Sequence, residues 1–215
     1  MAMSSFLDIL EERFGAGRPI LTEDVLATFP DESRSTVFYR LNSEVESGNL
    51  AKFNRGVYYI PEKVELFGRI VDVPLDPELV IERKYLKRDG EVIGFVSGLA
   101  LENRSRVSNQ VPAVLEITTN VETNRRRRVR PFGGYREVVL KKPRVPVTAG
   151  NVDTLEAIDL VENVDVGSLD ESELDAFRRK VAMADWVTMI ECLAAYPKKT
   201  VMKCLKEVEP AYVPA

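Results

Sequence analysis

The order of local patterns in the first 63 residues constrains the fold of this chain more than any other feature of the sequence. Three stretches with apolar residues at helical spacing are followed by two short extended runs, at residues 5–14, 22–29, 33–47, 50–53 and 57–60. Asn54-Arg55-Gly56 joins the two extended runs and predicts a hairpin turn. Helix, helix, turn, helix, hairpin is the order of a winged helix-turn-helix, so the sequence predicts that fold for residues 1–63.

Capping patterns mark where several helices are expected to begin. Ser5 and Asp8 have the spacing of a capping box, and Ser33 is placed to open the third helix. Ser168 and Glu171 repeat the capping-box spacing further along the chain. We therefore expect helices to start close to Ser5, Ser33 and Ser168.

The remaining sequence predicts a mixed α+β domain followed by helices. Residues 64–76 have the character of a linker. Helical or turn patterns fall at residues 77–87, 94–103 and 152–161, and strand patterns at residues 113–117, 125–130 and 137–140. We expect an α+β protein with a winged helix at 1–63, an α+β domain at 64–165 and C-terminal helices at 166–215 that pack on the second domain.

The C-terminal helices carry two apolar stripes that are expected to face the core. The stripes consist of Leu174, Phe177, Val181 and Ala184, and of Val187, Ile190 and Ala194. Trp186, the single tryptophan, is expected to lie in the core as well.

Histidine is absent from the chain, and its absence narrows the possible chemistry. A Ser/His/Asp or Cys/His triad is excluded, together with the commonest general base. Cys192 and Cys204 lie among apolar residues and are expected to be buried thiols, not metal ligands. We expect no enzyme, no metal and no cofactor. No apolar run approaches the ~20 residues that cross a membrane, and no signal peptide opens the chain, so a cytoplasmic protein without a membrane partner is expected.

Charge is distributed unevenly along the chain. The net charge is −4, but residues 1–63 carry −3, residues 64–150 carry +5 and residues 151–215 carry −6. Affinity for phosphates depends on the local potential and not on the net charge, so the basic middle segment is a candidate for contact with nucleic acid.

Candidate DNA contacts lie on the third predicted helix and at the hairpin tip. In a helix-turn-helix this helix enters the major groove, and residues near its start reach the base edges. Arginine can donate two hydrogen bonds to guanine, and the hydroxyls of Ser, Thr and Tyr suit phosphates or bases. The candidates are Arg34, Ser35, Thr36, Tyr39, Arg40, Asn54 and Arg55. No acidic residue lies between Ser33 and Ser43, which favours DNA contact over the alternative of an ordinary solvated helix face.

The densest charge run of the chain consists of Arg125, Arg126, Arg127 and Arg128, with Arg130 just beyond. Alternate side chains of a strand point to opposite faces, so the run cannot form one flat patch, and some arginines must pair with carboxylates or lie at a sheet edge. Two interpretations stay open. The run is a secondary basic patch that helps to hold nucleic acid, or it is solvated charge that discourages aggregation at a sheet edge.

Short motifs run through residues 4–162. They are Ser35-Thr36-Val37-Phe38-Tyr39-Arg40-Leu41, Gly48-Asn49-Leu50, Asn54-Arg55-Gly56-Val57-Tyr58-Tyr59-Ile60-Pro61, Gly94-Phe95-Val96-Ser97-Gly98-Leu99-Ala100-Leu101, Val111-Pro112 and Glu116-Ile117-Thr118-Thr119-Asn120. The first three resemble the N-terminal winged helix of the AbiEi-type antitoxins of bacterial type IV toxin–antitoxin systems. The others resemble the second domain of that family, with its Ser-Gly helix start and the strand that follows, and residues 148–160 are similar to its next helix.

The resemblance implies a protein with two functions. The winged helix would bind double-stranded operator DNA upstream of its own operon and repress transcription, with Arg34, Ser35, Thr36, Tyr39, Arg40 and Arg55 reading the DNA. The C-terminal domain would counteract a neighbouring nucleotidyltransferase-type toxin, usually without a stable toxin complex. No motif marks the antitoxic surface, and neither the operator nor the oligomeric state follows from the sequence.

Two other classes of function remain open. A protein-interaction scaffold would use the winged helix to dock a partner and would have no affinity for DNA, whereas the other alternative is a transcriptional regulator with no toxin partner. A nucleic-acid enzyme that uses carboxylates would need Mg²⁺ or Mn²⁺ and would lose turnover when one or two acids are replaced.

Overall fold

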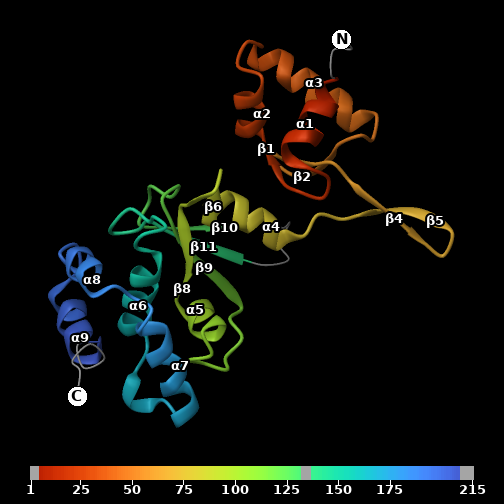
Figure 1. Ribbon diagram of the computed structural model, residues 1–215. Coiled ribbons are helices and arrows are strands. Elements are labelled where there is room, and N and C mark those ends of the chain that lie inside the picture. Colours follow the sequence, from red (N-terminus) through yellow and green to blue (C-terminus); the bar gives the residue numbers. More distant parts are fainter. Residues whose placement is uncertain (1–4, 132–136, 209–215) are drawn as a thin grey trace. The chain divides into compact units, whose positions relative to one another are not determined.

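The computed structural model describes residues 5–131 and 137–208 (Figure 1). The protein is mixed α+β, and its chain divides into two compact units, Met1–Lys84 and Tyr85–Ala215. The first unit therefore extends past the predicted 1–63 segment as far as Lys84.

Residues 6–60 of the first unit form three helices and a small sheet around one apolar core. The helices are α1 (Phe6–Phe14), α2 (Thr22–Thr28) and α3 (Arg34–Glu46), and the strands are β1 (Ile20–Leu21), β2 (Ala51–Asn54) and β3 (Val57–Tyr59). Strand β3 lies between β1 and β2 and runs antiparallel to both. The core consists of Phe6, Leu10, Ile20, Val25, Val37, Leu41, Leu50, Tyr58 and Ile60. The three helices and the hairpin that the sequence predicts here are confirmed.

Side-chain caps fix the starts of these helices. Ser5 caps α1 in a capping box, and the Oγ atom of Ser33 accepts the N–H of Thr36 at 3.1 Å, so both predicted starts are confirmed. Helix α2 is held differently, because the Asp24 carboxylate accepts the N–H of Leu21 at 3.0 Å.

Residues 62–73 form a β-hairpin, which corrects the prediction of a linker at 64–76. Strands β4 (Glu62–Leu66) and β5 (Arg69–Val73) pair antiparallel as a separate two-stranded sheet. Phe67 and Gly68 have φ angles of 52° and 74°, and two positive φ values are those of a type I′ turn. We call residues 62–73 the arm, which projects away from α1, α2 and α3 (Figure 1).

A helical segment follows the arm and confirms the pattern at residues 77–87. Helix α4 (Pro77–Ile81) continues into the π-helical turn η1 (Glu82–Leu86). The Arg83 guanidinium pairs with the Asp24 carboxylate at 2.9 Å, which connects η1 to α2 within the first unit.

The second unit contains a four-stranded mixed sheet. Its strands are β8 (Gly94–Ser97), β9 (Val114–Thr119), β10 (Arg126–Val129) and β11 (Glu137–Lys141), in the order β10-β11-β9-β8. Strands β9 and β11 are parallel, and the other neighbours are antiparallel. A short hairpin of β6 (Lys87–Arg88) and β7 (Glu91–Val92) precedes β8. The three strand patterns predicted between residues 113 and 140 are confirmed.

The segment at 94–103 is part strand and part helix, where the sequence indicated a short helix or turn. Strand β8 ends at Ser97, and α5 (Leu99–Arg104) begins directly after Gly98, which has a φ of 61°. Gly94 cannot carry a side chain, because an added Cβ would overlap the carbonyl oxygens of Tyr85 and Thr118. A fully buried strand lacks polar alternation, so its pattern resembles that of a buried helix.

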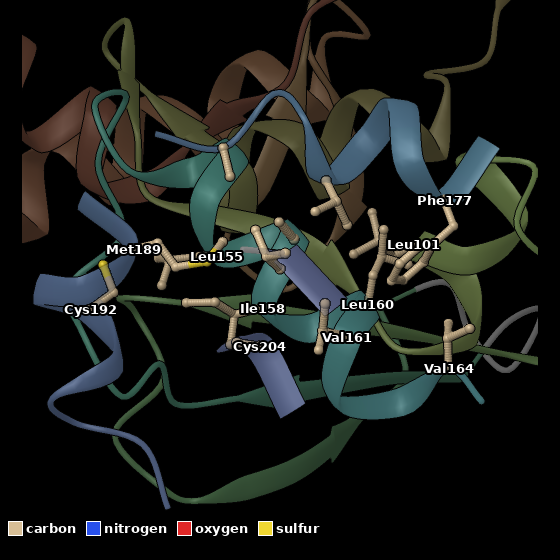
Figure 2. Close-up of a cluster of buried hydrophobic side chains, with 14 of the residues drawn as sticks. Leu101, Leu155, Ile158, Leu160, Val161, Val164, Phe177, Met189, Cys192 and Cys204 are labelled. Atoms are coloured by element: carbon tan, nitrogen blue, oxygen red, sulfur yellow. The ribbon is translucent and has the colours of Figure 1, made fainter. Parts of the chain in front are cut away.

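Helix α6 (Val152–Asn163) lies at the centre of the helical part of this unit. The short η2 (Val166–Ser168) and the helices α7 (Glu171–Val181), α8 (Trp186–Leu193) and α9 (Lys198–Val208) follow it. Figure 2 shows side chains from α6, α7, α8 and α9 meeting in one cluster. The fully buried members include Leu155, Ile158, Leu160, Val161, Met189 and Cys204. The C-terminal helices thus share their core with α6.

Two predictions for the C-terminal helices are wrong. Asp170 and not Ser168 caps α7, in a capping box with Glu173. The stripe of Val187, Ile190 and Ala194 faces solvent, because α8 buries the neighbouring stripe of Met189, Cys192 and Leu193. Helix α8 is apolar on more than one side, so its periodicity alone does not select the buried face. The Trp186 side chain is only partly buried and packs at the margin of the core.

No helix among the described residues is long and apolar enough to cross a membrane.

Candidate nucleic-acid interface

The first turn of α3 is a cluster of hydroxyl groups around its cap. The Oγ atom of Ser33 lies 2.8 Å from the Oγ of Ser35 and 2.8 Å from the Oγ1 of Thr36. All three residues are exposed, and the first turn of α3 contains no acidic residue. This end of the helix therefore presents hydrogen-bonding groups and the positive end of the helix dipole, with no carboxylate in the first turn itself, although Asp31 and Glu32 directly precede the cap.

The outward face of α3 is polar but uncharged over most of its length. Val37 and Leu41 are fully buried, so the opposite side of the helix faces solvent. Tyr39 lies at the centre of that side and is 76% exposed, with Ser35 and Ser43 one turn before and one turn after it. The helix thus offers a phenol and two hydroxyls to a partner.

The two arginines of α3 lie at the flanks of this face. The Arg34 guanidinium lies over the ring of Phe38, 5.6 Å from its centroid. The Arg40 guanidinium pairs with the Glu32 carboxylate at 3.1 Å and lies 5.6 Å from the centroid of the Phe6 ring. Arg40 is therefore engaged within its own unit, while Arg34 has no carboxylate partner among the described residues.

The hairpin turn between β2 and β3 lies beside the start of α3. Gly56 has a φ of 76°, and its carbonyl oxygen accepts the N–H of Thr22 at 3.0 Å, which anchors the turn to α2. Arg34, Thr22 and Gly56 line one hollow of about 410 Å³. Arg55 is exposed at the turn, whereas Asn54 is half-buried. The structure therefore brings Arg34 and the hairpin turn together.

The arginine run forms β10 at the edge of the sheet, and carboxylates pair with three of its members. Arg126 and Arg128 share one face of the sheet and pair with Glu116 and Glu137, at 2.6 and 3.4 Å. Arg127 points to the other face. The expectation that the run cannot form a flat patch is confirmed, and its pairing with carboxylates is the outcome that the strand geometry required.

Arg127 pairs with Glu122, whose carboxylate is almost completely buried, at 2.7 Å. Burial alone would raise the pKa of Glu122, but hydrogen bonds from Asn124 and Arg127 hold that pKa below its usual range. Arg127 therefore neutralises a buried carboxylate and is not available to a ligand without breaking this pair. Arg125 and Arg130, at the ends of the run, are exposed.

A basic hollow opens beside β10 in the second unit. It has a volume of about 670 Å³, and Asp159, Glu162 and Tyr196 also line it. Its cationic lining residues are Arg125, Arg126, Lys141, Lys142 and Arg144. Glu116 pairs with Arg126 and with Lys141, both at 2.6 Å. Arg125, Lys142 and Arg144 form no ion pair with a described residue. Unpaired positive charge beside the arginine run is therefore concentrated in this basic hollow.

Three of the five cationic residues that line the basic hollow were not predicted from the sequence. Lys141, Lys142 and Arg144 were not among the predicted basic residues. The signal was present as Lys141-Lys142-Pro143-Arg144 directly after the strand pattern at 137–140. The parallel pairing of β9 with β11 and the antiparallel pairing of β10 with β11 bring this segment beside Arg125 and Arg126.

Asp159 of α6 faces the basic hollow and is half-buried. Its carboxylate accepts the N–H of Gly98 at 2.7 Å. Burial raises the pKa of Asp159 to about 6, although the Gly98 N–H and the positive charge of Lys141 act in the opposite direction. Asp159 therefore changes its charge in the mildly acidic range, which is unusual for a carboxyl group.

The two cysteines are buried in the core and are free thiols. Burial raises the pKa of Cys192 and raises the pKa of Cys204 to about 12, so neither forms a reactive thiolate near neutral pH. The expected burial is confirmed. Within residues 5–131 and 137–208, no group of three or more His, Cys, Asp or Glu side chains is placed to hold a metal ion.

Comparison with models of known protein families finds no match for this chain. No curated protein matches it significantly either.

Proposed function

We propose that residues 1–63 form a winged helix-turn-helix that binds double-stranded DNA, with α3 in the major groove and the β2–β3 hairpin as the wing. The observation that carries the proposal is the acid-free start of α3 beside the hairpin turn, with Arg34 and Gly56 lining one hollow. A helix of this kind reads bases with its N-terminal half, while a neighbouring loop holds the phosphate backbone.

The residues have different roles in this proposal. Arg34 and Arg55 suit phosphate contacts or a guanine edge, and the hydroxyls of Ser35 and Thr36 suit bases or phosphates near the helix start. Tyr39, which protrudes from the centre of the face, would enter the groove. Arg40 can contribute only if DNA replaces Glu32 as its partner. Asn54 is half-buried at the end of β2, before the turn, and is less accessible to DNA than Arg55.

The charge of this segment predicts a weak dependence on salt for a DNA-binding protein. Residues 1–63 carry a net charge of −3, and few cations lie near the α3 face. Each neutralised phosphate contributes a slope of about −0.9 to the plot of log K against log salt, so two to four contacts predict a slope of about −2 to −4 per chain. Binding of the full chain to its own upstream DNA, measured at several salt concentrations, tests this value. A slope near zero, or no binding above random DNA, would contradict the proposal.

We infer further that the chain is the antitoxin of a bacterial type IV toxin–antitoxin system and the repressor of its own operon. The support is the resemblance of Gly94–Leu101 and Glu116–Asn120 to the AbiEi-type antitoxins. The C-terminal part would counteract a nucleotidyltransferase-type toxin without a stable complex, and the chain itself would not be an enzyme. Operator binding would place it in the cytoplasm.

The basic hollow fits this antitoxic role as a secondary nucleic-acid contact. Arg125, Lys142 and Arg144 are exposed there without carboxylate partners among the described residues. Such a site suits the phosphates of an RNA or DNA on which toxin and antitoxin would both act.

Growth rescue tests the antitoxin proposal independently of DNA binding. The gene beside this one is expressed with the full chain, with an Arg34→Glu variant and with a variant that carries Arg125→Glu and Arg144→Glu. We expect the full chain and Arg34→Glu to restore growth, because the α3 face would serve only repression. An adjacent gene that is not toxic, or toxicity that the full chain does not relieve, would overturn the proposal.

One observation favours a second candidate, a protein-interaction module. Tyr39 is a large exposed aromatic at the centre of an uncharged face, and the Arg40 guanidinium is held by Glu32. Faces of that composition also suit protein partners. A protein-docking α3 predicts that Arg34→Glu changes neither partner binding nor function, whereas Tyr39→Ala abolishes both.

A further inference from the structure

The arm has one apolar face and one polar face. In its register Glu62 lies opposite Val73, Val64 opposite Val71, and Leu66 opposite Arg69. Residues that lie opposite each other in an antiparallel pair share a face. The apolar face therefore consists of Glu62, Val64, Leu66, Arg69, Val71 and Val73. The polar face consists of Lys63, Glu65, Ile70 and Asp72.

Two apolar side chains of this face, Leu66 and Val71, are exposed, and Val64 and Val73 are partly buried. Leu66 is 53% exposed and Val71 38%, and the sheet that carries them has only two strands. A two-stranded hairpin is at best marginally stable in water, and its outer strand edges are templates for further pairing. An exposed apolar surface on such a hairpin indicates a partner.

The tip of the arm supports the same conclusion. Phe67 is completely exposed and has a φ of 52°, a conformation that glycine, asparagine and aspartate adopt far more easily. The hairpin of β6 and β7 has Asp89 and Gly90 at the corresponding positions, with φ angles of 49° and 84°. A bulky aromatic in this place is unfavourable for the turn, so its use points to a contact made by the ring.

The charges on the apolar face select the orientation of a second copy. Glu62 lies at the base of β4 and Arg69 at the tip of β5, so the two charges occupy diagonal corners of the face. If two arms pack face to face with their bases at the same end, each Glu62 approaches the other Glu62. If they pack antiparallel, base against tip, each Glu62 lies beside the Arg69 of the other arm. Unlike charges therefore favour the antiparallel packing.

We propose that two copies of the chain associate through their arms, face to face and antiparallel about a two-fold axis that passes near Val64 and Val71. Packing about this axis buries Val64, Leu66, Val71 and Val73 of both copies. It also places each Phe67 at the base of the other arm. The face is small for a protein interface, so the dimer forms reversibly with rising concentration.

A nucleic acid is a poor alternative occupant of the arm. Residues 62–73 contain three acids, Glu62, Glu65 and Asp72, and two bases, Lys63 and Arg69. A phosphate backbone would meet net negative charge and an apolar surface.

Sedimentation velocity of the full chain over about 1 to 200 μM tests the proposal, because the expected dimer population rises across such a range. We expect Val71→Asp to keep the protein monomeric. Ile70→Asp is the matched control, because it adds the same charge at the neighbouring position on the polar face. A wild-type chain that stays monomeric up to 200 μM, or a dimer that responds equally to both variants, overturns the proposal.

Charge reversal tests the antiparallel orientation. Glu62→Arg and Arg69→Glu should each weaken the dimer at least several-fold, and the double variant should recover the affinity of the wild type. The parallel arrangement predicts that neither single variant weakens the dimer, because like charges meet at each end in the wild type and in every variant. Single variants that keep the wild-type affinity, or a double variant that does not recover it, therefore contradict the antiparallel orientation.

Cross-linking locates the two-fold axis. Val71→Cys should give a covalent dimer with a short bis-maleimide reagent, whereas Ile70→Cys on the outer face should not. The natural Cys192 and Cys204 are buried, so the wild type supplies the background. All three experiments are done without DNA. The dimer proposal can therefore be refuted while the DNA-binding proposal stands, and DNA binding can be refuted while the dimer stands.

Discussion

Asp159 combines a buried carboxyl group with a basic surrounding. Because its pKa in the folded protein, about 6, lies above the unfolded value of 3.8, the folded state holds a proton between these pH values that the unfolded state releases. The contribution of Asp159 to stability is therefore fully present below pH 4 and is lost as the pH rises through 6. The loss is about 1–2 kcal/mol, because the side chain is partly open to the basic hollow and water screens part of the effect.

Asp159→Asn should remove this loss. The amide keeps an oxygen that can accept the Gly98 N–H, and it has no charge to bury. We expect the variant to gain about 1–2 kcal/mol over the wild type at pH 7.5 and little at pH 4.0, as measured by urea unfolding at both pH values. Asp175→Asn, which replaces an exposed acid of α7, is the control and should follow the wild type. The same difference from the wild type at both pH values would refute this account of Asp159.

The N-cap of α3 connects the stability of an element to its proposed role. Ser33 accepts the Thr36 N–H and also holds the Ser35 and Thr36 hydroxyls. Ser33→Ala should cost about 1 kcal/mol of stability and should weaken DNA binding, because the first turn of α3 loses its fixed geometry. Ser43→Ala, an exposed position of the same helix, should leave the stability unchanged. Chemical denaturation of both variants measures the first effect, and equal stability of the two would contradict it.

Elements were predictable from sequence where their apolar residues occur on one side only. The stripes of α1, α2 and α3 and the alternation at the start of β9 leave a single face to bury. Strand β8 is buried at every position, so its pattern does not distinguish a strand from a helix. Helix α8 is apolar on two sides, so its pattern does not show which side is buried. The arm was read as a linker because half of its positions are polar and its turn lacks the common Asn-Gly or Asp-Gly pair.

At the scale of the whole molecule, charge divides between the two units. Met1–Lys84 carries −5 and Tyr85–Ala215 carries +1, and the positive side chains of the second unit gather around the basic hollow. The arginine run was visible in the sequence, but its pairing with Glu116, Glu122 and Glu137 depends on strand register. The contribution of Lys142 and Arg144 likewise arises only when β11 pairs with β10 and β9.

The basic hollow yields a prediction for nucleic-acid binding by the full chain. Arg125→Glu with Arg144→Glu should reduce affinity for single-stranded RNA or DNA of random sequence about ten-fold at low salt and should lower the salt dependence. Lys198→Glu with Lys199→Glu, which reverses two exposed charges at the start of α9, is the matched control. Filter binding at two salt concentrations measures both pairs, and an equal loss in both would assign the effect to net charge instead of the hollow.

The most direct test of DNA binding by α3 compares two charge reversals in the first unit, Arg34→Glu and Arg18→Glu. Arg34 lies beside the hairpin turn. Arg18 is exposed and lies before β1, away from the turn. Leu21, at the end of β1, pairs with Val57 next to the turn, whereas the N–H of Gly17 donates to the carbonyl of Ile60 at the far end of β3. Fluorescence anisotropy measures the affinity of the wild type and of each variant for the upstream DNA, at about 100 mM salt and with random competitor DNA. We expect Arg34→Glu to weaken binding about ten-fold or more and Arg18→Glu to stay within about two-fold of the wild type. Equal losses in the two variants, or no preference of the wild type for its upstream DNA, would show that the start of α3 does not read DNA.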